Sequence, residues 1–157
     1  MKKQWTVALL LAVLSTGCMA QNRTETPARP TEQTESKGEV IKLTKEIFLA
    51  QVFNYEQEKD WKFLGKRPAI IDLYADWCGP CRQVAPVFKK LAKEYAGKVD
   101  FYKVNVDRER ELAAFFEVKG IPLFIFIPQD SEPRTLNGAI KEDDFRKIID
   151  QFLLKTE

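Results

Sequence analysis

The stretch from Pro68 to Cys81, PAIIDLYADWCGPC, decides the fold. Its first half is rich in aliphatic residues and predicts a buried strand that ends near Tyr74, and Gly79 and Pro80 then break the pattern. The apolar positions that follow share one face of a helix running to about Tyr95, and they are Val84, Val87, Phe88, Leu91 and Ala92. Pro86 lies inside this helix and should kink it. Two cysteines three residues apart therefore lie where a strand gives way to a helix.

The position of these cysteines has a chemical consequence. The first turn of a helix presents unpaired N–H groups and a partial positive charge, which stabilise a thiolate at Cys78. A thiolate is the nucleophile of disulfide exchange. Cys81 lies on the same helical face and can attack the mixed disulfide, while Gly79 and Pro80 shape the turn between the two cysteines. The pattern indicates a redox-active dithiol.

Two other interpretations of the pair involve no redox activity. Half of a structural zinc site would need further ligands, and the chain has no histidine and three cysteines in all, the third being Cys18 near the N-terminus. A purely structural disulfide would close so short a ring that it stabilises little. The absence of histidine also excludes Ser-His-Asp and Cys-His catalysis. We expect no metal and no cofactor.

The rest of the chain continues an alternation of strands and helices. The expected elements are a strand at 40–43, a helix capped by Thr44 and reaching 52, a loop or irregular helix at 54–67, a strand at 99–106, a helix capped by Asp107 and reaching 116, strands at 123–127 and 134–136, and a last helix through 153. With the central strand and helix, the order is β-α-β-α-β-α-β-β-α. This order predicts an α/β fold whose sheet has helices on both faces and is mixed, because the last two strands pair antiparallel.

The N-terminal segment resembles an export signal. Lys2 and Lys3 precede an apolar run at 7–14 and small residues at 15–17, so residues 1–20 predict a signal peptide. Gly17-Cys18 resembles a lipoprotein cleavage site, in which Cys18 would be lipidated, and the alternative is ordinary cleavage after Ala20. Residues 21–38 are polar and predict a disordered linker, so that one folded domain spans 39–157.

Charge argues against nucleic acid as a partner. The net charge of the whole chain is +2, and two of its 25 basic residues are Lys2 and Lys3. Without residues 1–20 the basic and acidic side chains balance, and a neutral domain offers phosphates no broad attraction.

Residues Ala75 to Cys81, ADWCGPC, closely resemble the active-site motif of the thioredoxin family, and the resemblance extends from about residue 39 to the end. It implies a thioredoxin fold with a central mixed sheet. It also implies a cis peptide bond between Ile121 and Pro122, in a loop facing the dithiol. The backbone of Ile121 would then pair with an extended substrate segment.

The resemblance also gives roles to residues outside the cysteine motif. Asp72 matches a buried aspartate that accepts a proton from Cys81 through water, and Lys103 matches its lysine partner. From the strand pattern alone, Asp72 could equally face solvent. Trp77 would flank the dithiol, and the apolar substrate-binding patch would include Gly79, Pro80, Ile121, Pro122 and Gly138. Alternatively, the Gly138 position could simply be a glycine required by a tight turn.

Other residues either differ from the family or have a structural role. Leu123 and Tyr74 differ from the usual family residues, and the loop at 54–67 is longer than in compact members. The aromatic residues Phe115, Phe116, Phe124 and Phe126 are expected to pack in the core.

The expected function is reduction of protein disulfides outside the cytoplasm, in a bacterial periplasm or envelope. Gly-Pro between the cysteines favours a reductant, and a reductant outside the cytoplasm needs electrons from a membrane thiol-electron carrier. The alternatives are an envelope oxidase or isomerase, and a redox-inert binding module. The partners would be disulfide-containing proteins, and the protein would be a monomer.

Overall fold

The computed structural model describes residues 38–155. The predicted signal peptide, the possible lipidation site Cys18 and the predicted linker up to residue 37 lie outside the described residues.

The described part contains five strands and four α-helices in the predicted order. They are β1 (Val40–Lys42), α1 (Lys45–Gln51), β2 (Ala69–Tyr74), α2 (Gly79–Glu94), β3 (Asp100–Asn105), α3 (Arg110–Phe115), β4 (Leu123–Ile127), β5 (Arg134–Asn137) and α4 (Glu142–Ile148). A π-helical turn, Ile149–Leu153, continues the last helix. Residues 52–68 contain neither helix nor strand, so the segment predicted as a loop or irregular helix is a loop.

The strands form one mixed sheet in the order β1-β3-β2-β4-β5. β1, β3 and β2 are parallel, whereas β4 pairs antiparallel with both β2 and β5. This confirms the predicted mixed sheet and the antiparallel pairing of the last two strands. β2, the strand that leads into the cysteine motif, has neighbours on both sides and is therefore held in the middle of the sheet.

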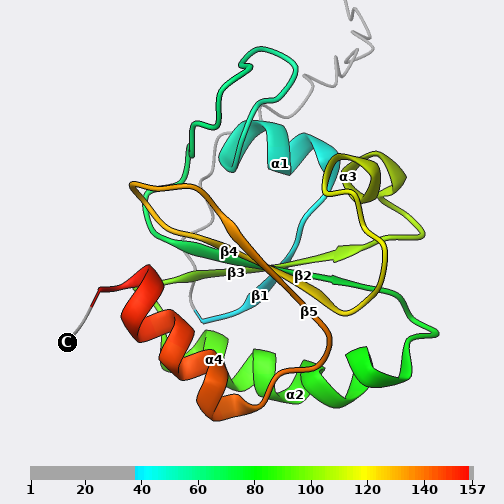
Figure 1. The fold of residues 1–157 in the computed structure, drawn as a ribbon, viewed down its shortest axis with the longest axis vertical. Helices are drawn as coiled ribbons and strands as arrows, with labels where there is room; N and C mark the ends of the chain where they lie inside the picture. Colours follow the sequence, from blue (N-terminus) through cyan, green and yellow to red (C-terminus); the bar gives the residue numbers. More distant parts are fainter. Residues whose placement is uncertain (1–37, 156–157) are drawn as a thin grey trace, which may run out of the picture. The chain divides into compact units, whose positions relative to one another are not determined.

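Helices cover both faces of the sheet, α1 and α3 on one and α2 and α4 on the other (Figure 1). Because successive residues of a strand point to opposite faces, β2 contributes to both layers. Ile71 and Leu73 join the core with Phe48 of α1, whereas Ile70 joins the core with Phe88 of α2. The site is thus carried by a strand and a helix that are both anchored in the core.

Two local expectations concern helix starts. Thr44 caps α1 as predicted, since its Oγ1 accepts a hydrogen bond from the amide of Ile47 at 3.4 Å. Asp107 was expected to cap the next helix, and this was wrong. α3 begins three residues later at Arg110, and its N-cap residue, Glu109, makes no side-chain capping bond.

The expected aromatic core residues divide between the two faces. Phe124 and Phe126 are buried on the face covered by α2 and α4. Phe115 and Phe116 lie on the opposite face, where Phe115 stacks on Tyr55 of the loop with ring centroids 4.6 Å apart. Phe115 remains 37% exposed, so the expectation of a buried core residue was wrong for this position. Its ring supports the loop from the outside.

Candidate active site

Cys78 and Cys81 form a disulfide at the start of α2. Cys78 is the N-cap residue of this helix, and its Sγ accepts a hydrogen bond from the amide of Cys81 at 3.2 Å. The two residues are only 3% and 4% exposed. The first cysteine therefore lies where helix amides and the helix dipole stabilise negative charge on sulfur, as the sequence predicted.

The local sequence explains why the helix begins here. Gly79 and Pro80 occupy its first two positions, where the missing N–H of proline costs no helical hydrogen bond. Gly79 is half-buried and Pro80 is exposed, so this turn lies at the protein surface beside the disulfide. Pro86 lies further along, inside α2.

A second loop, between α3 and β4, lies beside the cysteines. Ile121 packs against a buried cluster made of Ala75 and the two cysteines. The bond between Ile121 and Pro122 is cis, and Pro122 itself is buried. The structure thus places Ile121, whose backbone is predicted to pair with substrate, next to the disulfide.

Gly138 is tied to this loop by a backbone bond. Its amide donates to the carbonyl of Pro122 at 2.8 Å. It has a φ of +92°, which favours glycine, and a Cβ at this position would meet nothing within 4 Å. The turn alone therefore explains the glycine, while the open space above it also leaves room for a partner.

Trp77 is the most exposed large side chain at the site. It is 68% exposed, and its indole N–H donates to a carboxylate oxygen of Asp107 at 3.0 Å. This contact of Asp107 with the site is one that sequence reasoning missed. The sequence carried no local signal for it, because an exposed indole N–H can be satisfied by water and the two residues are 30 positions apart.

Asp72 lies beneath the helix that carries the cysteines. It is only 6% exposed, and its Oδ1 has no hydrogen-bond partner among residues 38–155. Burial raises the pKa of Asp72 to about 7, and the charge of Lys103 opposes this rise. Asp72 and Ala85, four residues after Cys81, line the same cavity. The outward-facing alternative for Asp72 therefore does not hold.

Lys103 is the register partner of Asp72 on the neighbouring strand β3. The two side chains form no ion pair with each other, and the ammonium of Lys103 lies 5.6 Å from the centre of the Tyr74 ring. The lysine therefore acts on the aspartate through space and leaves the carboxylate without a direct partner.

Metal-ligand clusters and membrane-spanning helices are absent from residues 38–155. Within residues 38–155, no group of three or more His, Cys, Asp or Glu side chains could hold a metal ion. No helix in that range is long and apolar enough to cross a membrane.

Comparison with known proteins identifies the family. The Thioredoxin family model matches residues 39–151. This chain belongs to the thioredoxin family. Thioredoxin from Borreliella burgdorferi is 46% identical over 112 residues, which cover 71% of this chain and 96% of that protein. The chloroplastic M-type thioredoxin of Spinacia oleracea is 31% identical, with 73% of this chain and 63% of that protein covered.

Solved structures agree with this assignment. Thioredoxin f from spinach chloroplast superposes with a TM-score of 0.58 at 31% identity, covering 72% of this thioredoxin and 85% of that chain. The predicted thioredoxin fold is thereby confirmed. With the Cys78–Cys81 pair in place, this thioredoxin is an enzyme of the protein-disulfide oxidoreductase class.

Proposed function

We propose that this thioredoxin reduces disulfide bonds of proteins outside the cytoplasm by cycling Cys78 and Cys81 between dithiol and disulfide. The observation that carries the proposal is the position of the Cys78 sulfur at the N-cap of α2, where it accepts the amide hydrogen of Cys81. The same contact would stabilise the thiolate of the reduced form and so prepare it for attack.

The reaction has two exchange steps. The Cys78 thiolate attacks a substrate disulfide, a Cys78–substrate bond forms, and the other substrate sulfur leaves as a thiolate that takes up a proton. Cys81 then gives its proton to Asp72 through water and attacks the Cys78 sulfur, which releases the second substrate thiolate. Two electrons pass to the substrate, and the Cys78–Cys81 disulfide remains.

The structure suggests how the neighbouring residues assist these steps. Ile121 packs beside the disulfide, and an extended substrate segment would pair with its backbone. Trp77, Gly79, Pro80, Pro122 and Gly138 would form the surface that this segment contacts. Lys103 would moderate the charge on Asp72 without neutralising it.

The role of the cysteines is tested by two single variants. Cys78→Ser should abolish reduction of a disulfide-containing protein, because the attacking sulfur is gone. Cys81→Ser should instead accumulate the mixed disulfide, which mass spectrometry detects, because the resolving sulfur is gone. Reduction at the native rate by the Cys78→Ser protein would overturn the proposal. It would also be overturned if a variant lacking both cysteines bound its partners as tightly as the native protein, without any disulfide exchange.

The direction of exchange is tested by the reduction potential of the couple. A value of about −270 mV, typical of thioredoxin, supports a reductase, whereas a value of about −120 mV, typical of a strong disulfide oxidase, would make the protein an oxidase or isomerase. The Gly-Pro pair supports the reductase.

The proposed location outside the cytoplasm rests on the sequence of residues 1–20. Their basic start, apolar run and small residues support export, and Cys18 would carry a lipid if cleavage follows Gly17. A reductant there would draw electrons from a membrane thiol-electron carrier and would act as a monomer. Fractionation of a bacterium expressing the full chain tests this, with Cys18→Ala as the control for lipidation. Retention of the uncleaved chain in the cytoplasm would contradict export.

A further inference from the structure

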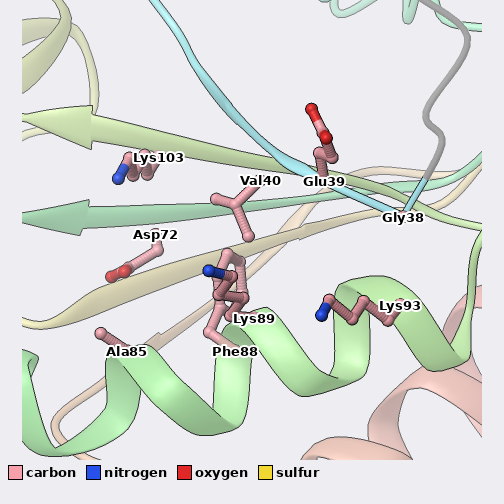
Figure 2. A pocket seen from close by; sticks show the side chains of 9 residues that line it. All are labelled: Gly38, Glu39, Val40, Asp72, Ala85, Phe88, Lys89, Lys93 and Lys103. Atoms are coloured by element: carbon pink, nitrogen blue, oxygen red, sulfur yellow. The ribbon is translucent and has the colours of Figure 1, made fainter.

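A cavity of about 520 Å³ opens between α2 and the strands β1, β2 and β3. Figure 2 shows Asp72 and Lys103 on neighbouring strands above it, with Lys89 and Lys93 on α2 below. Glu39, immediately before β1, is the remaining charged residue that lines it. The cavity is far larger than one water molecule requires.

The charges around this cavity are unevenly paired. Lys89, Lys93 and Lys103 form no ion pair with any residue of 38–155, although other lysines of the same domain do. Lys90, the sequence neighbour of Lys89, reaches Glu142 at 2.7 Å. Three ammonium groups therefore line one cavity without an internal counter-charge other than Glu39 and Asp72.

The inner wall of the cavity holds the buried Asp72, whose Oδ1 lacks a hydrogen-bond partner among the described residues. A carboxylate there repels an anion, whereas a protonated carboxyl can donate a hydrogen bond to one. The cavity thus combines cations at the rim with a group that can change from repelling an anion to binding it.

We propose that this cavity binds a small divalent oxyanion, with its charge held by Lys89, Lys93 and Lys103 and with the protonated carboxyl of Asp72 as a hydrogen-bond donor. Anion binding in the cavity and ionisation of Asp72 then oppose each other, because each adds negative charge to the same space. If Asp72 accepts the proton of Cys81, as in the proposed function, a bound anion slows release of the mixed disulfide. The binding itself does not depend on that function.

The test uses sulfate as the probe and the full-length oxidised protein. Sulfate is suitable because it remains a dianion at neutral pH, so that any pH dependence comes from the protein. A titration followed by NMR should shift the amide signals of α2 and β3 around the cavity, and sodium chloride at equal ionic strength should not. Sulfate shifts spread evenly over the surface lysines would overturn the proposal.

Charge variants locate the binding. Lys89→Gln with Lys93→Gln should weaken sulfate binding by about tenfold, since each lysine at an exposed site contributes a few-fold. Lys89→Gln and Lys93→Gln alone should each weaken binding a few-fold. Lys90→Gln is the matched control for these single variants, because it removes one charge from the same helix outside the cavity and should leave the affinity unchanged. Equal losses for the control and for the single variants would overturn the proposal.

A pH series tests the coupling to Asp72. The affinity of the native protein for sulfate should fall several-fold as the pH rises from about 6 to about 8, while Asp72→Asn should bind with little change over that range. Glu39, Lys89, Lys93 and Lys103 are the other charged groups facing the site, and the Asp72→Asn variant keeps all of them. If that variant keeps the pH dependence, the coupling is wrong. Because these measurements involve no turnover, they are independent of the exchange activity.

Discussion

Two aspartates lie buried on adjacent strands of this sheet and have opposite surroundings. Asp100, at the start of β3, is 7% exposed and accepts hydrogen bonds from the Nε and Nη2 of Arg67 at 3.1 and 2.9 Å. Asp72, on β2, is equally buried but has one carboxylate oxygen without a partner among residues 38–155. Strand alternation places Asp100 on the face of α1 and α3 and Asp72 on the face of α2 and α4.

The difference separates a structural carboxylate from one suited to proton transfer. A buried charge that meets a guanidinium is satisfied and fixes the local structure. A buried carboxylate that is left unsatisfied costs stability and has a raised pKa, which a proton acceptor working near neutral pH requires. The sheet thus carries a stabilising aspartate and a destabilising one at similar depth.

Replacement of Asp72 should have the largest effect. Burial raises the pKa of Asp72 from 3.8 to about 7, so its neutral form is favoured in the folded protein. We expect Asp72→Asn to raise the free energy of unfolding at about pH 8 by roughly 2–4 kcal/mol, since each unit of pKa shift corresponds to about 1.36 kcal/mol. Release of the mixed disulfide should slow in the same variant. Urea denaturation and a trapped-intermediate assay measure the two effects.

The size of this effect depends on pH. The stability that the neutral Asp72 contributes is fully present below the pKa of the unfolded chain and is lost as the pH rises through about 7. The native protein and Asp72→Asn should therefore be similarly stable near about pH 4, and the gap between them should widen up to about pH 8. A gap that is constant across this range would show that the carboxylate is not the source of the effect.

Replacement of Asp100 should act in the opposite direction. Asp100→Asn keeps the shape but removes the charge that Arg67 binds, so we expect a loss of about 1.5–3 kcal/mol in the free energy of unfolding. The rate of disulfide exchange should be unchanged, because Asp100 faces the other side of the sheet. If both aspartate variants were more stable than the native protein, pairing with Arg67 would not be what distinguishes them.

Much of the fold could be predicted because its signals are local. The aliphatic strand at 69–74, the break at Gly79 and the one-sided apolar pattern of α2 each reside in a few consecutive residues. Thr44 was predicted as a cap for the same reason. The part of the site at the junction between the strand at 69–74 and the helix that begins at Gly79 could be predicted from the sequence. For this reason Cys78 could be placed at a helix start in advance.

The remaining features depend on contacts between distant residues. Asp107 has the sequence appearance of a helix cap, but the indole of Trp77, 30 residues away, binds its carboxylate. Arg67 and Asp100 are 33 residues apart, and nothing local marks them as a pair. The bond between Gly138 and Pro122 follows from the antiparallel register of Leu123 with Asn137, which periodicity does not specify.

The smallest expected effect concerns Lys103, the cation nearest in register to Asp72. Its charge lowers the pKa of Asp72 without an ion pair, so Lys103→Met should raise that pKa further and by less than burial does. An NMR titration of the Asp72 carboxyl measures the change, and Lys42→Met, one strand further away on β1, is the matched control. Arg67 holds Asp100 by direct hydrogen bonds, whereas Lys103 acts on Asp72 only through space. An unchanged Asp72 titration in Lys103→Met would therefore leave burial as the sole cause of the raised pKa, and the contrast between the two aspartates would become sharper.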